Sequence, residues 1–261
     1  MPMIATRCKQ WRLMASFFCL FSAGLAHSQT AAPSSPVQPH TVSNTAQVAP
    51  LLRPFTARYE VFRSGDKHGE ADRHLAQLAD GYELGFTSDI TYLIYQDKRI
   101  ETSQFKVENG QVHPLSYQMN IEKTGPDKFY KVTFDRQNQQ IRVGKKQDLK
   151  PLPWNENWLD TNSFHAQLVL DLKAGKKDFV YQVLNRDGNP REYKYKVVAE
   201  ELLSLPFGQV KALRIERYGQ TADRQVHAWV APELDFMLVR LWQAEDNVEL
   251  FDVQLKSYQL Q

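Results

Sequence analysis

Apolar residues recur at every second position in short segments along most of this 261-residue chain. In the segment 55–62, Phe55, Ala57, Tyr59 and Val61 alternate with polar or charged residues. Successive side chains of a β-strand point to opposite faces, so this period of two predicts strands with one buried and one hydrated face. The segments that repeat the pattern are 82–86, 90–95, 105–107, 116–122, 129–134, 140–143, 179–184, 191–200, 210–218, 225–231, 237–243 and 248–260.

Short turn signals separate these segments. Asn109-Gly110 and Asp187-Gly188 are dipeptides that favour tight hairpin turns. Parallel sheets need a helix between successive strands, and only one segment of the chain has a helical period. A run of roughly a dozen hairpin-linked strands accumulates twist and must protect its edges, so it tends to curl. We therefore predict a mainly all-β protein, a long antiparallel meander curled into a half-barrel or β-roll with one covering α-helix.

The segment 152–175 is the exception to the period of two. Phe164, Leu168 and Leu172 are spaced by four residues, which gives a helix one apolar face. A lysine in the last turn and a glycine just beyond it are typical of a helix end. The pattern predicts a helix near 161–174.

Asp160, Ser163 and His165 lie within six positions of one another, which raises the question of a catalytic triad. On a helix, side chains two residues apart point about 200° from each other, so His165 cannot activate Ser163 there. No Gly-x-Ser-x-Gly motif accompanies them. Short polar side chains at a helix start accept hydrogen bonds from free backbone N–H groups. We therefore predict that Asp160 and Ser163 are structural helix caps, and we identify no catalytic residue.

Two tryptophans, Trp154 and Trp158, precede the predicted helix, and two interpretations of them stay open. In the first, the indoles fold over one end of the barrel and close its core, because large aromatic side chains dominate cores by area. In the second, they form an aromatic rim at the mouth of a ligand cavity. Phe164 and Leu168, on the apolar helix face, then complete the set of ligand-rim candidates.

The other polar residues form no motif for a metal or a cofactor. The seven histidines show no chelating pair with a nearby carboxylate. The glycines are scattered at turns and form no phosphate-binding loop. We predict no metal site and no cofactor.

The first 26 residues have the pattern of a secretory signal peptide. Three basic residues precede a short apolar run over 13–26, and small residues close that run. We expect cleavage near Ala26–Ser28, a periplasmic location and no integral membrane span after cleavage; an uncleaved N-terminal anchor is the alternative. Both cysteines lie in this segment, so the mature chain is expected to contain no disulfide.

A second boundary is expected near residue 52. Residues 27–52 are rich in Pro, Ser and Ala and are predicted to be a disordered tether, because they cannot bury enough apolar surface to fold. One antiparallel β domain is expected over 53–261. Loss of the signal peptide changes the formal charge from +2 to −1, and the chain has no basic block, so nucleic acid is not an expected partner.

Five sequence motifs occur in an order and spacing that resemble those of a known family. They are FTARYEVFRSG, DKRIETSQFKVENGQVHPLSYQM, LDTNSFHAQLVL, LPFGQVKALRIER and AWVAPELDFMLVRL. Over about residues 53–258 the chain resembles a bacterial exported family known only as domain of unknown function 3108. The resemblance implies a periplasmic all-β protein without an assigned activity, so no catalytic residue is carried over. The final hairpins are also similar in fold to periplasmic lipoprotein carriers, whose half-barrel shelters acyl chains.

Three functions compete. The strand count, the single helix and the tryptophan pair favour a non-enzymatic cell-envelope protein that binds a hydrophobic small molecule or lipid in a curved sheet. The first alternative is a protein–protein interaction module that docks an edge strand or the tether onto an envelope protein. The second is a hydrolase whose catalytic residues converge only in space. The lack of a recognisable catalytic motif favours the first function.

Overall fold

The computed structural model describes residues 52–92, 95–219 and 224–261. The predicted signal peptide, its cleavage site and all but the last residue of the predicted tether lie outside these ranges, so those expectations and the domain boundary stay predictions. The described chain contains the strands β1 (Phe55–Arg63), β2 (Asp66–Leu78), β3 (Gly81–Tyr92), β4 (Tyr95–Glu108), β5 (Gln111–Lys123), β6 (Gly125–Asp135), β7 (Gln140–Val143), β8 (Asp148–Lys150), β9 (Trp158–Asp160), β10 (Asp178–Leu184), β11 (Pro190–Leu205), β12 (Gly208–Tyr218), β13 (Arg224–Ala231), β14 (Met237–Glu245) and β15 (Val248–Leu260). The α-helix is α2 (Phe164–Lys173), and the 3-10 helix η1 (Pro232–Leu234) joins β13 to β14.

All these strands belong to one 15-stranded sheet in the order β8-β7-β6-β5-β4-β3-β2-β1-β15-β14-β13-β12-β11-β10-β9. Neighbours in the sheet are neighbours along the chain, except that β1 pairs with β15. The predicted antiparallel meander is therefore confirmed. One pair departs from it, because β9 and β10 are parallel. Helix α2 lies between these two strands in the sequence, and a helical crossover is the connection that parallel strands require.

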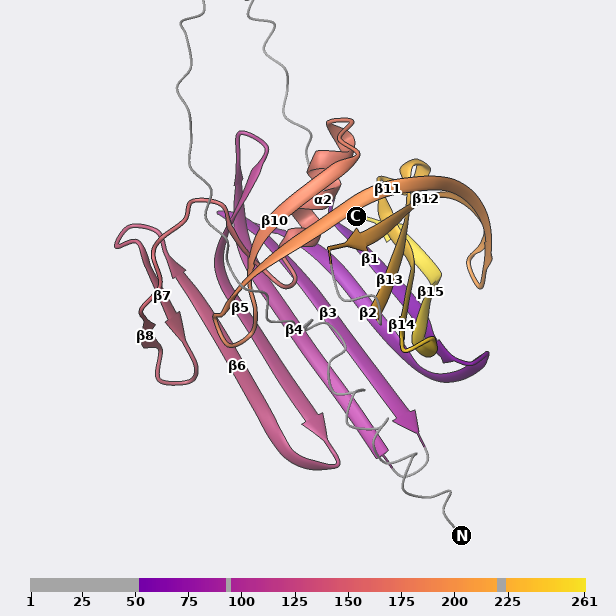
Figure 1. Ribbon diagram of the computed structural model, residues 1–261, viewed down its shortest axis with the longest axis horizontal. Coiled ribbons are helices and arrows are strands. Elements are labelled where there is room, and N and C mark those ends of the chain that lie inside the picture. The colour runs from indigo at the N-terminus through magenta and orange to yellow at the C-terminus, as the bar shows by residue number, and fades with distance from the viewer. Residues whose placement is uncertain (1–51, 93–94, 220–223) are drawn as a thin grey trace, which may run out of the picture.

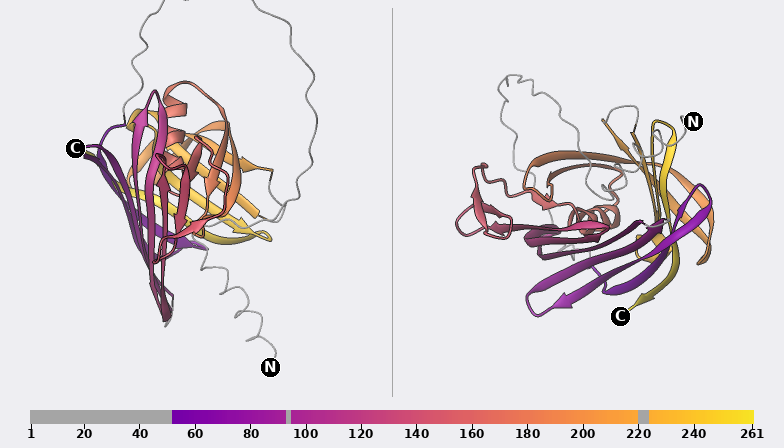
Figure 2. Two further views of the ribbon diagram at one scale, coloured as in Figure 1. Left: turned by 90° about the vertical axis from the view of Figure 1, so that its left-hand side faces the viewer. Right: turned by 90° about the horizontal axis from the view of Figure 1, so that it is seen from below.

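The sheet curls until its two wings, β1 to β8 and β9 to β15, face each other (Figures 1 and 2). Strand β9, at one end of the sheet, contacts β5, and β6 to β8 continue beyond that contact as an extension. The described strands do not close into a barrel, because no ladder joins β5 to β9. Register shifts between Arg58 and Tyr59 and between Val61 and Phe62 mark bulges in β1, and bulges increase local twist. The predicted curled all-β fold is confirmed.

Helix α2 lies inside the curl, between the long strands of one wing and the arch of β10 and β11 (Figure 2). Phe164, Leu168 and Leu172 are buried, as their spacing by four predicts. Gln167 and Asp171, which belong to the polar side of the helix, are buried too. The helix therefore fills one end of the roll, and it begins three residues later than the sequence analysis predicts.

Three hydrophobic clusters fill the interior. The first lies between β1, β3 and β13 to β15 and includes Tyr59, Phe86 and Trp229. The second joins the apolar face of α2 to β10, β11 and β12 and to residues such as Leu84. The third lies at the extension, where Tyr117 of β5 packs in one cluster with residues of β6, β7 and β9. The first two clusters meet beside the helix, where the cavity described below lies.

Strand β2 has no counterpart in the sequence analysis. Its inner row is Ala71, Arg73 and Leu75, all buried, at alternate positions. The charged residue in this row breaks the apolar alternation that identifies the other strands. Burial of a guanidinium is costly, so a charged residue predicts a hydrated position unless a specific partner is known.

Candidate functional site

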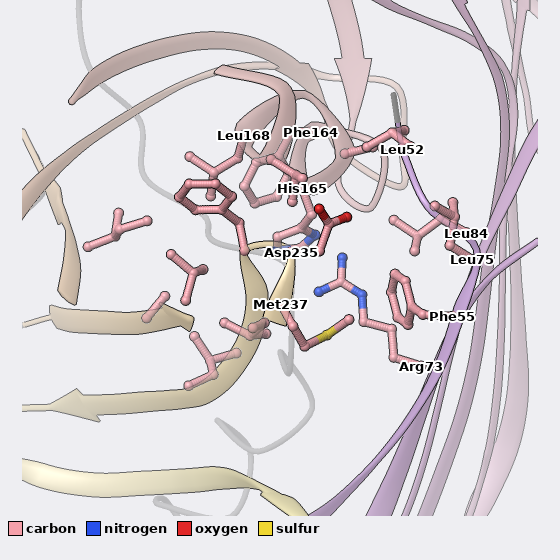
Figure 3. Close-up of a pocket in the computed structure, with 18 of the residues that line it drawn as sticks. Leu52, Phe55, Arg73, Leu75, Leu84, Phe164, His165, Leu168, Asp235 and Met237 are labelled. Carbon is pink, nitrogen blue, oxygen red and sulfur yellow. The ribbon is translucent and has the colours of Figure 1, made fainter. Parts of the chain in front are cut away.

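A mainly apolar cavity of about 100 Å³ lies between helix α2 and the inner faces of the two wings (Figure 3). Its walls come from β1, β2 and β3, from β11 to β14, and from the segment that follows η1. Its apolar lining includes Leu52, Phe55, Leu75, Leu84, Phe164, Leu168, Tyr195, Val230, Phe236, Met237 and Leu241. Segments that are distant in sequence therefore build one apolar space.

The size of the cavity restricts what it can hold. Pockets for drug-sized ligands have about 300–1,000 Å³, several times the volume here. A second cavity of about 20 Å³ shares Arg73, His165, Leu238 and Leu241 with the first, so the two are adjacent. A narrow chain of methylene groups fits such a space better than a bulky ring system.

Arg73 is the buried cation of the cavity wall. Antiparallel pairing places it between Ala57 of β1 and Phe86 of β3 on the concave face. Its side chain points into the cavity toward His165 and Asp235 (Figure 3), and it is only 9% exposed. Burial lowers the pKa of the guanidinium, although an arginine stays protonated under ordinary conditions.

The guanidinium of Arg73 forms no hydrogen bond and no ion pair with any residue of the described ranges. It carries five N–H donors, and a buried charge without a partner costs several kcal/mol, by order of magnitude. Such a charge is rarely kept in a core unless something else satisfies it. The cavity wall therefore presents a cation that has no direct hydrogen-bond or ion-pair partner in the described ranges, although Tyr59 and Glu101 attract it from a greater distance.

His165 lies beside Arg73 at the start of α2. Its Nδ1 donates to the carbonyl oxygen of Asn162 at 3.1 Å, because a carbonyl can only accept. Burial, and then the positive charge of Arg73, hold the pKa of this imidazole well below its ordinary value. At neutral pH the ring is therefore uncharged and adds no second cation to the cavity.

The segment after η1 forms another part of the wall. Asp235 and Phe236 both have φ values of 59°, in the left-handed region that is unfavourable for residues other than glycine. The Asp235 carboxylate lies 2.8 Å from Nζ of Lys173 in the last turn of α2. This ion pair ties the helix end to the strained segment and neutralises the carboxylate at the cavity.

Glu101 lines the smaller cavity from the inner face of β4. Burial raises its pKa to about 7, and a hydrogen bond from the Tyr117 hydroxyl at 2.9 Å opposes that rise. Its other carboxyl oxygen, Oε1, has no hydrogen-bond partner among the described residues. Glu101 and Arg73 border the same space, yet they form no ion pair.

The structure divides the four ligand-rim candidates. Phe164 and Leu168 line the cavity, as the second interpretation of the sequence expects of them. Trp154 and Trp158 do not line it. They pack in the third cluster, with Tyr117 and its neighbours. Trp158 is therefore a core residue and Trp154 packs, half-buried, against the same cluster, because β9 with Trp158 lies at one end of the sheet and contacts β5.

Asp160 and Ser163 form a reciprocal turn ahead of the helix. The Asp160 carboxylate accepts from the backbone N–H groups of Asn162 and Ser163, both at 2.8 Å, and the Ser163 hydroxyl accepts from the Asp160 N–H at 3.0 Å. Ser163 occupies the N-cap position, but its side chain makes no cap hydrogen bond to the helix. The Asp160 carboxylate also accepts from the Ser103 hydroxyl at 2.6 Å, which anchors the turn to β4.

Asp160 and Ser163 of the suspected triad bond to each other, whereas the His165 imidazole donates to the Asn162 backbone. The Ser163 hydroxyl bonds to Asp160 backbone and the His165 imidazole bonds to Asn162 backbone, so the structure shows no Ser–His–Asp relay. Within the described ranges, no group of three His, Cys, Asp or Glu side chains is placed to hold a metal ion. In the same ranges, no helix has the length and apolar character needed to cross a membrane.

Sequence reasoning did not find Arg73, Asp235 or Glu101. A signal for Arg73 exists in the segment EADRHLAQL, where the arginine takes the central place of an Ala-x-Arg-x-Leu row. A charged residue at an inward position between two apolar ones is worth testing as a buried site residue. Asp235 and Glu101 have no comparable local signal, because chain folding from distant elements creates their surroundings.

Comparison with known proteins gives a family and a fold. The family model described as "Protein of unknown function (DUF3108)" matches residues 55–251. No curated protein sequence matches this chain. A crystal structure of a β-barrel-like protein of domain of unknown function DUF1849 from Brucella abortus is similar with a TM-score of 0.55 and 10% identity, over 80% of this chain and 98% of that one. At this identity the likeness concerns the fold only.

A second solved structure, described as a "putative lipoprotein" from Parabacteroides distasonis, has a TM-score of 0.30 and 11% identity, over 80% of this chain and 97% of that one. That score supports no further statement about this chain. The fold likeness that the comparisons carry is therefore the one to the β-barrel-like protein.

Proposed function

Because the chain belongs to the DUF3108 family, which carries no assigned function, we propose from its cavity that it is a non-enzymatic cell-envelope protein that binds a hydrophobic, lipid-like ligand inside the rolled sheet. The observation that carries the proposal is an apolar cavity in the interior, lined by Phe164 and Leu168 of the helix and by Phe236 of the segment after η1. A filled core would leave no such space, because protein interiors pack with few voids larger than a water molecule.

A periplasmic location is part of the proposal. The basic residues and the short apolar run at the start of the chain support export, with cleavage near Ala26–Ser28. A periplasmic protein that carries a lipid-like molecule must hide the apolar part of its cargo from water. The interior of a curled sheet performs that task, because the cavity removes alkyl surface from solvent at about 25 cal/mol per Å².

Native mass spectrometry of the protein purified after export, under conditions that keep bound lipids, tests the proposal. We expect a mass above that of the bare mature chain, with the excess released by organic solvent. The substitution Ala228→Phe places a large side chain at a cavity-lining position and should abolish the excess mass. The matched control Ala79→Phe, at an exposed position, should retain it.

Two results together would refute the proposal. One is a bare-chain mass for the exported protein. The other is the failure of the solvent-extracted protein to bind any single-chain amphiphile in vitro. Circular dichroism of both variants should show the strand content of the parent protein, so that loss of binding is not confused with loss of fold.

A further inference from the structure

Arg73 is a buried cation of the cavity wall that no residue of the described ranges pairs directly. Arg73 is 9% exposed, points into the cavity, and has no hydrogen bond or ion pair with the described part of the chain (Figure 3). It also has Ala57 and Phe86 as its neighbours across the strands, so the surrounding wall is apolar. An apolar environment strengthens the attraction between this guanidinium and any anion that replaces water there.

Three other ionisable groups at the larger cavity add little net charge. Asp235 is paired with Lys173 at 2.8 Å, and His165 is an uncharged ring that already donates to a backbone carbonyl. Arg53 lines the cavity but is exposed to solvent, which screens its charge. Glu101 borders the smaller cavity together with Arg73, and because burial raises its pKa to about 7, its carboxyl group is mostly protonated and uncharged below that pH. Under these conditions the buried part of the two cavities carries a net charge of about one positive unit, which matches a monoanion.

We propose that Arg73 binds the carboxylate of a single-chain amphiphile, such as a fatty acid, whose alkyl chain occupies the apolar cavity. This inference rests on the proposed ligand-binding function and names the class of ligand. The planar guanidinium forms two parallel hydrogen bonds with a carboxylate, a geometry that an alcohol or an amide cannot reproduce. A phosphate monoester would bring nearly two negative charges to a site that holds one buried cation.

The geometry of the cavity supports a single chain. The larger space is about 100 Å³ and the adjacent one about 20 Å³, and Arg73 belongs to the wall of both. A head group at Arg73 can therefore extend its alkyl chain along the face of α2, past Phe164 and Leu168. A chain of more than a few methylene groups exceeds these volumes, so the far end of a longer chain must extend out of the cavity, which is not fully enclosed.

Calorimetric titration with amphiphiles of equal chain length tests the inference. The exported protein, freed of endogenous lipid, is titrated with dodecanoate, 1-dodecanol and dodecyltrimethylammonium, each below its micelle concentration. We expect dodecanoate to bind about 10- to 100-fold more tightly than dodecanol, the difference that a charge-assisted hydrogen-bonded pair typically makes. The cationic amphiphile should bind more weakly than both.

The substitution Arg73→Gln should remove the preference for dodecanoate and leave the affinity for dodecanol within about threefold. The matched control Arg58→Gln, on the neighbouring strand, changes an arginine whose side chain is 73% exposed and should keep the preference. If Arg73→Gln does not fold, the dodecanoate-to-dodecanol ratio of the unchanged protein still decides the question.

The outcomes separate this inference from the proposed function. Equal affinities of the unchanged protein for dodecanoate and dodecanol would overturn the role of Arg73 and leave the lipid-binding function standing. A carboxylate preference that survives in Arg73→Gln would also overturn it. Failure of all three amphiphiles to bind would refute the proposed function itself.

Discussion

The burial of Arg73 without a direct partner should make the ligand-free protein less stable than it would be with an apolar residue at this position. Replacement of buried charges by apolar residues of similar volume is often neutral or stabilising, by up to about 4 kcal/mol. We expect Arg73→Met to raise the free energy of unfolding of the ligand-free protein by about 1–3 kcal/mol. Urea unfolding followed by circular dichroism measures the change.

Arg58→Met is the control for this prediction, because Arg58 lies on the outer face of β1 and is 73% exposed. Its surface ion pair with Asp72 contributes little, so we expect a change within about 0.5 kcal/mol. A clear loss of stability in Arg73→Met would show that the guanidinium already has a stabilising partner in the ligand-free state.

Glu101 makes stability depend on pH. Burial raises its pKa to about 7 in the folded protein, from an ordinary value of 4.5. Between these two values the folded state holds a proton that the unfolded state has lost, so the free energy of unfolding falls as the pH rises. The loss of stability caused by ionising the buried Glu101 is absent below about pH 4. It is complete above about pH 8, where it reaches about 3 kcal/mol.

The substitution Glu101→Gln removes this titration and keeps an acceptor for the Tyr117 hydroxyl. We expect the variant to be about 3 kcal/mol more stable than the parent at pH 8 and nearly equal to it at pH 4. Urea unfolding at both pH values tests this. An equal difference at the two pH values would show that the carboxyl group does not titrate between them.

At the scale of elements, Gln167 docks helix α2 onto the β4–β5 hairpin. Its Oε1 accepts from the Val112 N–H at 2.7 Å, and its Nε2 donates to the Gly110 carbonyl at 3.1 Å. The side-chain amide therefore replaces a peptide group at the turn. Gln167→Leu keeps the volume but removes both partners, and a buried group left unsatisfied costs about 1–3 kcal/mol.

We expect Gln167→Leu to lower the free energy of unfolding by about 1–3 kcal/mol, as measured by urea unfolding. The control Gln77→Leu, at an exposed position, should change it by less than about 0.5 kcal/mol. Parent-like stability in Gln167→Leu would mean that water satisfies the two backbone groups. The variant also leaves the apolar cavity residues unchanged, so amphiphile binding should weaken only as far as the helix loosens.

The elements that sequence predicts are those with a local signal. Alternation identifies a strand such as β1, and spacing by four identifies α2, because both patterns follow from the geometry of a single element. Strand β2 was missed because Arg73 interrupts its buried apolar row. Local patterns say which face is buried, but not which strand lies beside it. The β9–β10 pairing and the enclosure of α2 therefore had no sequence signal.

The candidate site was predictable to the same limited degree. Phe164 and Leu168 follow from the apolar face of the helix, which had to point into the roll. The tryptophans were ambiguous because aromatic residues suit both a core and a rim; the parallel pairing of β9 places Trp158 in the core, and Trp154 packs half-buried against it. The charged residues of the cavity depend on contacts between distant strands, which local patterns do not encode.

At the scale of the molecule, the pairing of β1 with β15 joins the two wings into one sheet. Phe55 pairs with Leu260, and the Gln261 N–H donates to the Pro54 carbonyl at 3.0 Å, so the two chain ends of the described sheet are adjacent. Without this pairing the strands would form two separate meanders, β1 to β8 and β9 to β15. The cavity needs both, because its lining includes Leu75 from the first and Val230 from the second.

A circular permutant tests this arrangement. A short Gly/Ser linker joins Gln261 to Leu52, and the chain is opened between Glu156 and Asn157, in the exposed loop before β9. The permuted chain then runs β9 to β15 and β1 to β8, so that every strand follows its spatial neighbour in the sheet. Linker insertion at adjacent chain ends is usually tolerated. We expect one cooperative urea transition and amphiphile affinities within about threefold of the parent.

Deletion of β15 is the comparison for the permutant, because it leaves β1 and β14 as long unpaired edges. Exposed edges of this kind promote aggregation, and removal of Val253 and Leu255 also opens the first hydrophobic cluster. We expect the deleted chain to aggregate and to bind no amphiphile, as judged by size-exclusion chromatography and calorimetry. Two separate unfolding transitions of the permutant would show that the two meanders fold independently. A β15 deletion that stays monomeric and binds dodecanoate would show that the cavity does not depend on their union.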